Sequence, residues 1–186
     1  MTSKPHTDLT VVYEPRLRDL NGYWVDKCHG RSMPARADID PVELKRHLAN
    51  LVLVDVSGPP SQFRFRLAGT DIVARYGAEL TGRNLNDIDL GSDLAAIKEQ
   101  YEATVLERTP TYCRHFIETK KRKHLNYERL LMPLSEDGST VNMLLGGIYP
   151  LPPEVVAAAG EAAAANRNDD GRGAGQAVVL LKARSA

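Results

Sequence analysis

FRFRLAGTDIVARYGAELTGRNL, residues 63–85, joins a strand pattern to a helical pattern within one short run of sequence. Phenylalanine or leucine alternates with arginine over residues 63–67, which is typical of a half-buried antiparallel strand. Residues 70–76 have the character of a short helix, and Gly77 is placed to end it in the left-handed conformation. The stretch therefore predicts a strand that turns at Gly69 into a helix.

The glycines of this stretch do not fit a phosphate-binding loop. A dinucleotide cradle needs G-x-G-x-x-G after a parallel strand and before a long helix. Gly69, Gly77 and Gly82 are instead eight and five residues apart, and the strand pattern before them is antiparallel. We interpret them as residues of a turn, a helix end and a loop.

The elements predicted on either side define the fold class. Residues 51–57 indicate a buried strand that forms a hairpin with the strand at the start of the quoted stretch. Residues 93–107 have the apolar stripe of a longer helix, and three further strands are expected at 111–118, 125–134 and 141–149. Two strands, several helices and then three strands make an α+β fold with an antiparallel sheet, not the alternating order of a doubly wound fold.

The sequence before the sheet predicts an amphipathic helix over residues 14–29. Leu17, Leu20 and Trp24 recur at helical spacing, and Gly30 follows as a helix stop. This apolar stripe could pack on the chain's own sheet or on another subunit, and the sequence leaves both open.

An extended link over residues 34–40 is expected to lead into a short helix with Leu44 and Leu48 on its apolar side. Asp38 and Asp40 in this link could share an acid–base task or bind a cation. We favour the simpler explanation, in which Asp40 caps the helix and Asp38 forms a salt bridge with a nearby arginine.

The sequence changes character after Pro150. An alanine-rich helix is expected near residues 155–165, followed by a flexible linker over 166–176. The predicted division of the chain is an N-terminal tail (1–13), the flanking helix and short helix (14–50), the core (51–150) and an alanine-rich, partly disordered tail (151–186).

Composition excludes several classes of function. The chain of 186 residues carries 24 Lys and Arg against 24 Asp and Glu, so no net charge attracts nucleic acid. Cys28 and Cys113 are too few and too far apart for a disulfide framework or a zinc site, and no metal-ligand or G-x-S-x-G motif occurs. No stretch approaches the roughly 20 apolar residues of a membrane span, and we expect a cytoplasmic protein.

Four segments of the sequence resemble the PAS domain family. They are FRFRLAGTDIVARYG, LTGRNLNDI, MPARADIDPVELKRHLANLVLVDV and RLLMPLSEDGSTVNMLLGGIY. They are similar to the small single-domain PAS proteins of alphaproteobacteria. The resemblance implies a five-stranded antiparallel sheet with a helical cluster on one face and an N-terminal flanking helix. It also implies a sensory or interaction module, a small molecule between helices and sheet, and a homodimer formed through the flanking helix.

Two cofactors known in PAS relatives make different demands on these residues. Light-sensing relatives carry a reactive cysteine directly after a Gly-Arg-Asn run, where this chain has Leu85, so the flavin adduct cannot form here, although a flavin could still be held without covalent chemistry. Haem ligation through His115 is less expected than an ordinary structural role for a strand histidine. The sequence therefore leaves the cofactor unknown.

The candidate site is a pocket or packed core between helices and sheet. Strand alternation leaves open whether His115 and Arg129 face the interior; an interior arginine could pair with a carboxylate or phosphate. The candidate pocket residues are Phe65, Leu67, Ile72, Val73, Tyr76, Leu85, His115, Arg129, Leu131, Met143 and Leu145. The candidate dimer or partner residues are Leu17, Leu20, Trp24, Lys120, Lys121, Arg122 and Lys123.

These observations predict a stand-alone, non-catalytic sensory or regulatory module. Ligand or partner binding would be transmitted through protein contacts. The alternative is a small-molecule-binding protein or small enzyme that uses the concave face of the sheet.

Overall fold

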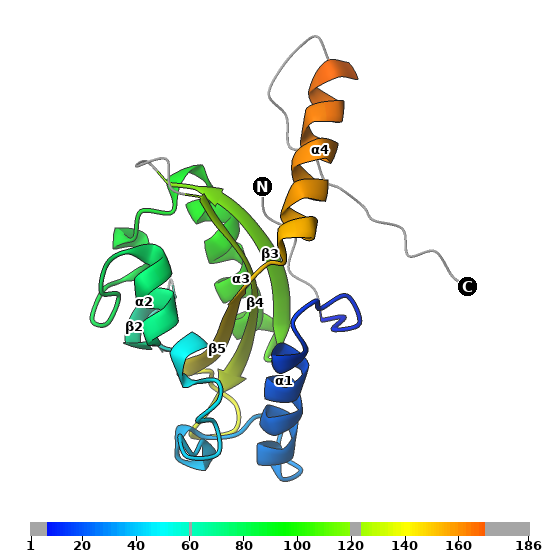
Figure 1. The fold of residues 1–186 in the computed structure, drawn as a ribbon. Coiled ribbons are helices and arrows are strands. Elements are labelled where there is room, and N and C mark those ends of the chain that lie inside the picture. The colour runs from blue at the N-terminus through cyan, green and yellow to red at the C-terminus, as the bar shows by residue number, and fades with distance from the viewer. Residues whose placement is uncertain (1–6, 60, 120–123, 170–186) are drawn as a thin grey trace.

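The computed structural model describes residues 7–59, 61–119 and 124–169, and it forms a five-stranded antiparallel sheet flanked by helices (Figure 1). The spatial order of the strands is β2-β1-β5-β4-β3. This architecture confirms the predicted α+β fold. The strands are β1 (Leu51–Ser57), β2 (Gln62–Ala68), β3 (Thr111–Glu118), β4 (His124–Leu134) and β5 (Met143–Pro150).

Within these described ranges, four α-helices and four short 3-10 turns connect and flank the strands. The helices are α1 (Pro15–Cys28), α2 (Thr70–Tyr76), α3 (Leu94–Glu107) and α4 (Pro153–Asp169). The 3-10 turns are η1 (Arg36–Asp38), η2 (Leu48–Asn50), η3 (Leu85–Asp87) and η4 (Gly91–Asp93). In the described part of the chain, no helix combines the length and apolar character that a membrane crossing requires.

The sheet is covered on both faces. Helices α2 and α3 lie on one side, which we call the inner face, and α1 lies on the other, the outer face (Figure 1). The apolar stripe of α1 is buried, with Leu17 and Leu20 at 0% exposure. Gly147 of β5 makes room for it, because a Cβ there would lie 2.8 Å from Leu17 and 2.7 Å from Leu20. Trp24 completes the contact by donating its indole N–H to the Pro133 carbonyl oxygen at 2.8 Å.

This packing decides between the two roles left open for the stripe. Leu17, Leu20 and Trp24 cover the chain's own sheet, so they are not available to a second subunit and the proposed partner role for these three side chains is wrong. The basic candidates Lys120, Lys121, Arg122 and Lys123 lie outside the described residues.

A buried carboxylate fixes the start of α1 on the outer face. Glu128 of β4 is 0% exposed and accepts hydrogen bonds from the backbone N–H groups of Tyr13 (3.1 Å) and Glu14 (2.5 Å). The Tyr112 hydroxyl of β3 donates a third at 2.5 Å. Three donors therefore converge on one carboxylate, which ties the helix entry to two strands.

The quoted stretch folds as predicted. Gly69 ends β2 and begins α2, and its N–H donates to the Leu51 carbonyl oxygen at 2.8 Å. A Cβ at Gly69 would overlap the backbone carbonyl oxygens of Leu48 and Ala49, so only glycine fits this turn. Gly77 ends α2 with φ 85°, the left-handed conformation expected of it.

Three local predictions need correction. The link over 34–40 contains η1, and residues 41–47 form consecutive turns in place of a helix. Leu44 is buried, but Leu48 is 40% exposed, so the segment lacks the second apolar contact that a helix there would have needed. Helix α4 continues through 166–169, part of the predicted linker, because no proline or glycine interrupts those residues.

We expect Gly69→Ala to destabilise the protein by about 2–3 kcal/mol, because the methyl group displaces the backbone of η2. Gly22→Ala is the matched control. Gly22 lies within α1 and a Cβ added there would meet nothing within 4 Å, so the same substitution should stabilise by up to about 1 kcal/mol. Urea unfolding of both variants measures the difference, and equal effects would contradict the packing assigned to Gly69.

We expect Glu128→Gln to cost about 2–3 kcal/mol, because an amide cannot accept from three donors as a carboxylate does and turns its own N–H toward them. Amide exchange at the start of α1 should rise as well. Glu102→Gln removes only an exposed i,i+4 pair with Lys98 and should change stability by less than about 0.5 kcal/mol. Unchanged exchange in Glu128→Gln would show that the carboxylate does not hold α1.

Candidate functional site

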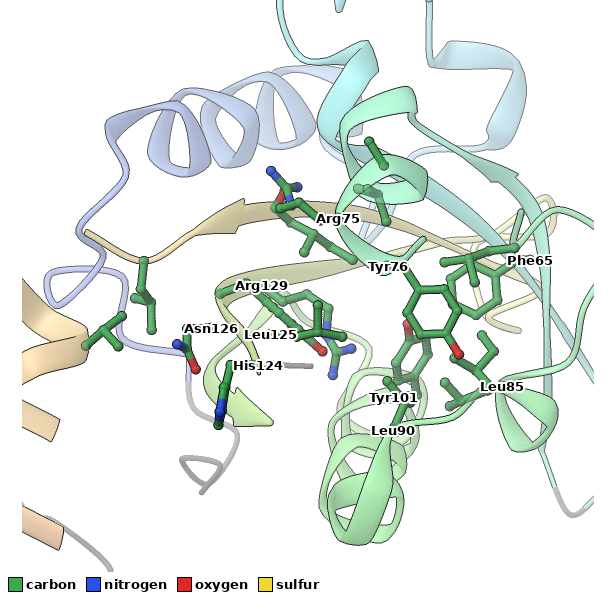
Figure 2. Close-up of a pocket in the computed structure, with 18 of the residues that line it drawn as sticks. Phe65, Arg75, Tyr76, Leu85, Leu90, Tyr101, His124, Leu125, Asn126 and Arg129 are labelled. Carbon is green, nitrogen blue, oxygen red and sulfur yellow. The ribbon is translucent and has the colours of Figure 1, made fainter. Parts of the chain in front are cut away.

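A cavity of about 730 Å³ lies between the helices and the inner face of the sheet (Figure 2). Its size is in the range of small-molecule pockets, and its walls are mainly aliphatic and aromatic. The apolar wall consists of Phe65, Ile72, Tyr76, Leu80, Leu85, Ile88, Leu90, Tyr101, Leu125, Tyr127, Ile148 and Leu151. The first turn of α4 closes one side with Pro153, Val156 and Ala157.

Arg129 is the buried charge of this cavity. Arg129 belongs to β4 and is only 2% exposed. Its side chain points toward Tyr101 of α3 (Figure 2). The guanidinium carbon lies 4.7 Å from the centroid of the Tyr101 ring, which is a cation–π contact. Its Nε donates to Gln100 Oε1 at 2.9 Å. The sequence left the direction of this side chain open, and the structure turns it inward.

Arg75 is a second arginine in the cavity wall, but its guanidinium is engaged elsewhere. It donates to Asn50 Oδ1 at 2.8 Å and to the Ile148 carbonyl oxygen at 3.0 Å. Asn50 in turn donates to Asp71 Oδ2 at 3.0 Å. Burial lowers the pKa of Arg75, and Asp71 opposes that shift. We assign Arg75 to joining α2, η2 and β5.

Five of the eleven predicted pocket residues line the cavity, namely Phe65, Ile72, Tyr76, Leu85 and Arg129. The Tyr76 hydroxyl accepts from the Asp89 backbone N–H at 2.7 Å, which fixes the ring against the loop between α2 and α3. Leu85 of η3 is 2% exposed. The quoted stretch therefore supplies much of one wall.

Three predicted residues lie on the wrong face. Leu145 and Met143 lie on the same face of β5 as Gly147, which is the outer face that α1 covers. In the ladder Leu145 pairs with Leu53. Leu67 also faces outward and is 40% exposed. A β-bulge in the β1–β2 ladder explains Leu67: the register shifts at Leu53, so the residue loses the orientation that it would share with Phe65.

The other three predicted residues lie near the inner face without reaching the cavity. Leu131 is buried where it would contact a Cβ on Gly146, and Val73 is a half-buried residue of α2 outside the wall. His115 is 0% exposed and faces inward, but the Tyr127 ring (centroids 4.8 Å apart) and Gln100 lie against it. None of these three predicted residues is therefore part of the cavity wall.

Sequence reasoning missed several wall residues. Tyr101 was visible in the stripe of the predicted helix, and Tyr127 precedes Arg129 by two residues on the same strand face, so alternation could have found both. The polar residues His124 and Asn126 also line the cavity. No signal in the alanine-rich sequence pointed to Ala157.

The sequence profile of the PAS domain family matches residues 12–149. The chain belongs to the PAS domain family. The matched range contains α1, nearly all of the sheet and most of the cavity wall. The wall residues Leu151, Pro153, Val156 and Ala157 follow it. The predicted family and the coarse function, a PAS-type sensory domain, are thereby confirmed. No curated protein matches the sequence.

Solved structures with a similar fold include light-oxygen-voltage domains and other PAS domains. One light-oxygen-voltage domain studied with a flavin analogue has 16% identity and a TM-score of 0.50, covering 67% of this chain and 93% of that chain. The PAS domain of Bordetella pertussis BvgS has 14% identity and a TM-score of 0.45, with 68% and 99% covered. The Rhodobacter sphaeroides light-oxygen-voltage protein has 18% identity and a TM-score of 0.47, with 77% and 86% covered. At these identities the likeness concerns the fold alone.

The positions of Leu85, the two cysteines and His115 decide how well this PAS domain suits flavin-adduct or haem chemistry. Leu85 places a hydrocarbon side chain in the cavity wall, and the two cysteines are buried in α1 and β3, away from the lining. His115 is screened from the cavity by Tyr127 and Gln100, so its geometry does not favour an axial haem ligand held there. In the described ranges, no cluster of three or more His, Cys, Asp or Glu is arranged to hold a metal.

The acidic link does not form an acid–base pair. Asp38 accepts from Arg31 Nη2 at 2.5 Å and from the Ala35 N–H at 2.7 Å, and the bond from Arg31 is the main reason that the Asp38 pKa is lowered. Asp40 accepts from the Val42 N–H at 2.8 Å. The salt-bridge and capping explanation is confirmed, although Asp40 caps a turn in place of a helix.

Two tyrosines of the cavity wall, Tyr101 and Tyr127, are neutral at physiological pH. Burial raises the pKa of Tyr127 to about 12, with Arg129 acting in the opposite direction. Burial likewise raises the pKa of Tyr101, again against the influence of Arg129. The histidine behind them is neutral as well, because burial and then the Arg129 charge hold the pKa of His115 well below its usual value.

This His115 shift predicts a pH dependence of stability. The unfolded histidine binds a proton near pH 6.5 and the folded one only at lower pH, so the free energy of unfolding falls as pH drops below about 6.5, by up to about 1.4 kcal/mol per unit. His115→Gln should flatten this slope whatever its effect on absolute stability. Urea unfolding between pH 5 and 7.5, compared with wild type, measures it; parallel curves would contradict the assignment.

Proposed function

We propose that this PAS domain is a ligand-responsive, non-catalytic regulatory module in which occupancy of the cavity changes the position of α4. The observation that supports this is the composition of the wall: Pro153, Val156 and Ala157 of α4 contact the same space as the core residues. A ligand in that space would touch both the PAS core and the helix that follows it.

The mechanism requires different affinities for two positions of α4. A ligand shifts such an equilibrium only by the difference between its affinities for the two states. Contacts with Val156 and Ala157 would be made when α4 is docked and lost when it moves, so they can supply that difference. Leu151, whose N–H donates to the Asn126 carbonyl oxygen at 3.1 Å, anchors the connection before the helix.

The arrangement of α4 favours output through protein contacts. The helix leaves the end of β5 and extends away from the sheet, where a partner or a second copy of the chain can reach it (Figure 1). We propose that the predicted homodimer or other partner uses this helix, since the α1 stripe is already buried. The basic segment 120–123 remains a second predicted partner contact.

The engaged acidic residues support the non-catalytic part of the proposal. Asp38 is held by Arg31 and Asp40 accepts from a turn N–H, and neither residue is part of the cavity wall. Among the described residues, those that line the cavity include no Asp or Glu. A cytoplasmic location stays a prediction from the sequence.

Binding of naphthalene-2-acetamide, a neutral aromatic probe, tests this function with Ala157→Trp and Ala158→Trp as a matched pair. The indole at 157 should fill the cavity mouth and weaken binding about tenfold or more, which corresponds to about 1.4 kcal/mol, while that at 158 lies outside the wall and should leave binding unchanged. Calorimetry measures the affinities.

The same probe should slow amide exchange over residues 154–160 of wild type. Slower exchange at α4 on binding supports coupling between the cavity and the helix. Binding without any change at α4 would contradict the regulatory mechanism.

A further inference from the structure

The charge of Arg129 is not neutralised by any carboxylate in the described residues. Buried charges in folded proteins are normally paired, because removing an ion from water is costly. Arg129 is 2% exposed, yet no ion pair joins it to a carboxylate within the described part of the chain. Its hydrogen-bond partner at Nε is the neutral amide of Gln100, 2.9 Å away.

The guanidinium is nevertheless held in a fixed orientation. Gln100 is itself 0% exposed and donates to the carbonyl oxygens of Thr111 (2.9 Å) and Arg129 (3.3 Å), which sets the direction of its Oε1. The terminal nitrogens of Arg129 have a long contact, 3.5 Å from Nη2 to the Ile97 carbonyl oxygen, and the side chain also interacts with the Tyr101 hydroxyl, which opposes the rise that burial causes in the Tyr101 pKa. Gln100 and Tyr101 therefore orient the guanidinium, and Arg129 lines the cavity with only neutral hydrogen-bond partners among the described residues.

The described wall residues around Arg129 are positive or neutral, and Asp93, which does not line the cavity, acts on the wall by raising the pKa of Tyr127. The described residues of the wall contain no Asp or Glu, and the second arginine, Arg75, has Asn50 and a backbone carbonyl as partners. His115 on the neighbouring strand is held neutral by the burial that lowers its pKa, so it adds no charge of its own. No acidic side chain of this described wall competes with an anion for Arg129.

We propose, on the basis of the ligand-responsive function above, that this cavity takes an apolar, ring-bearing carboxylate whose carboxylate pairs with Arg129. A planar guanidinium matches the two oxygens of a carboxylate, and a single buried cation matches a single negative charge. A phosphate dianion would bring a second negative charge, and the second wall arginine, Arg75, already has Asn50 and the Ile148 carbonyl oxygen as partners. The rings of Phe65, Tyr101 and Tyr127 provide flat surfaces for an aromatic or otherwise unsaturated body.

Naphthalene-2-acetate and naphthalene-2-acetamide form a matched pair of probes, because they share the ring and differ in charge. Calorimetry at pH 7.5 should show the acid binding wild type about tenfold or more tightly than the amide, as expected for hydrogen bonds to a charged group. The ratio of the two affinities should fall toward one in Arg129→Met. Arg129→Lys, which keeps the charge without the planar fork, should retain part of it.

Arg66→Met is the charge control, because it removes an exposed arginine that pairs with Asp55 on the surface and should keep the wild-type ratio. Continued binding of the amide by Arg129→Met shows that the cavity is intact. A preference for the acid that persists in Arg129→Met would overturn the assignment. Equal affinities in wild type would overturn this inference alone, whereas binding of neither probe would overturn the proposed function as well.

Discussion

A sheet that is apolar on both faces has to be covered twice, and the organisation of this protein follows from that requirement. The middle strands β4 and β5 are buried along most of their length, so neither face can be left to solvent. On the outer face, α1 supplies the cover and Glu128 holds its first residues to the strands. On the inner face, α2 and α3 leave a space that the first turn of α4 completes.

The elements could be predicted because their signals are local. Alternation over 63–67, a turn at Gly69 and a helix stop at Gly77 each depend on neighbouring residues, and all three are present in the structure. The predicted helix over 41–47 does not form, and the reason is again local. Its one buried leucine, Leu44, gives too little apolar contact.

The site was harder to predict because alternation divides a strand into two faces without saying which face the helices cover. Leu145 and Met143 satisfied the pattern and still lie beneath α1. Leu67 needed knowledge of a bulge that involves a second strand. The contribution of Ala157 depends on where α4 starts in space, and a run of alanines carries no such information.

Keeping Arg129 inside the core has an energetic consequence. The protein gives up some folding free energy to hold a guanidinium that is surrounded by an amide, backbone and aromatic groups, and the cavity. Functional sites commonly carry such a cost, because the group that binds is already oriented before its ligand arrives. The anchoring by Gln100 is what makes that orientation possible.

The position of Trp24 has a spectroscopic consequence. It is the one tryptophan in the sequence, and its indole N–H is bonded to the Pro133 carbonyl oxygen at the contact between α1 and the sheet. Indole emission responds to polarity, so its wavelength reports whether α1 is docked. Because the cavity lies on the opposite face, the protein carries a built-in fluorophore that follows the outer layer separately from the space where a ligand would sit.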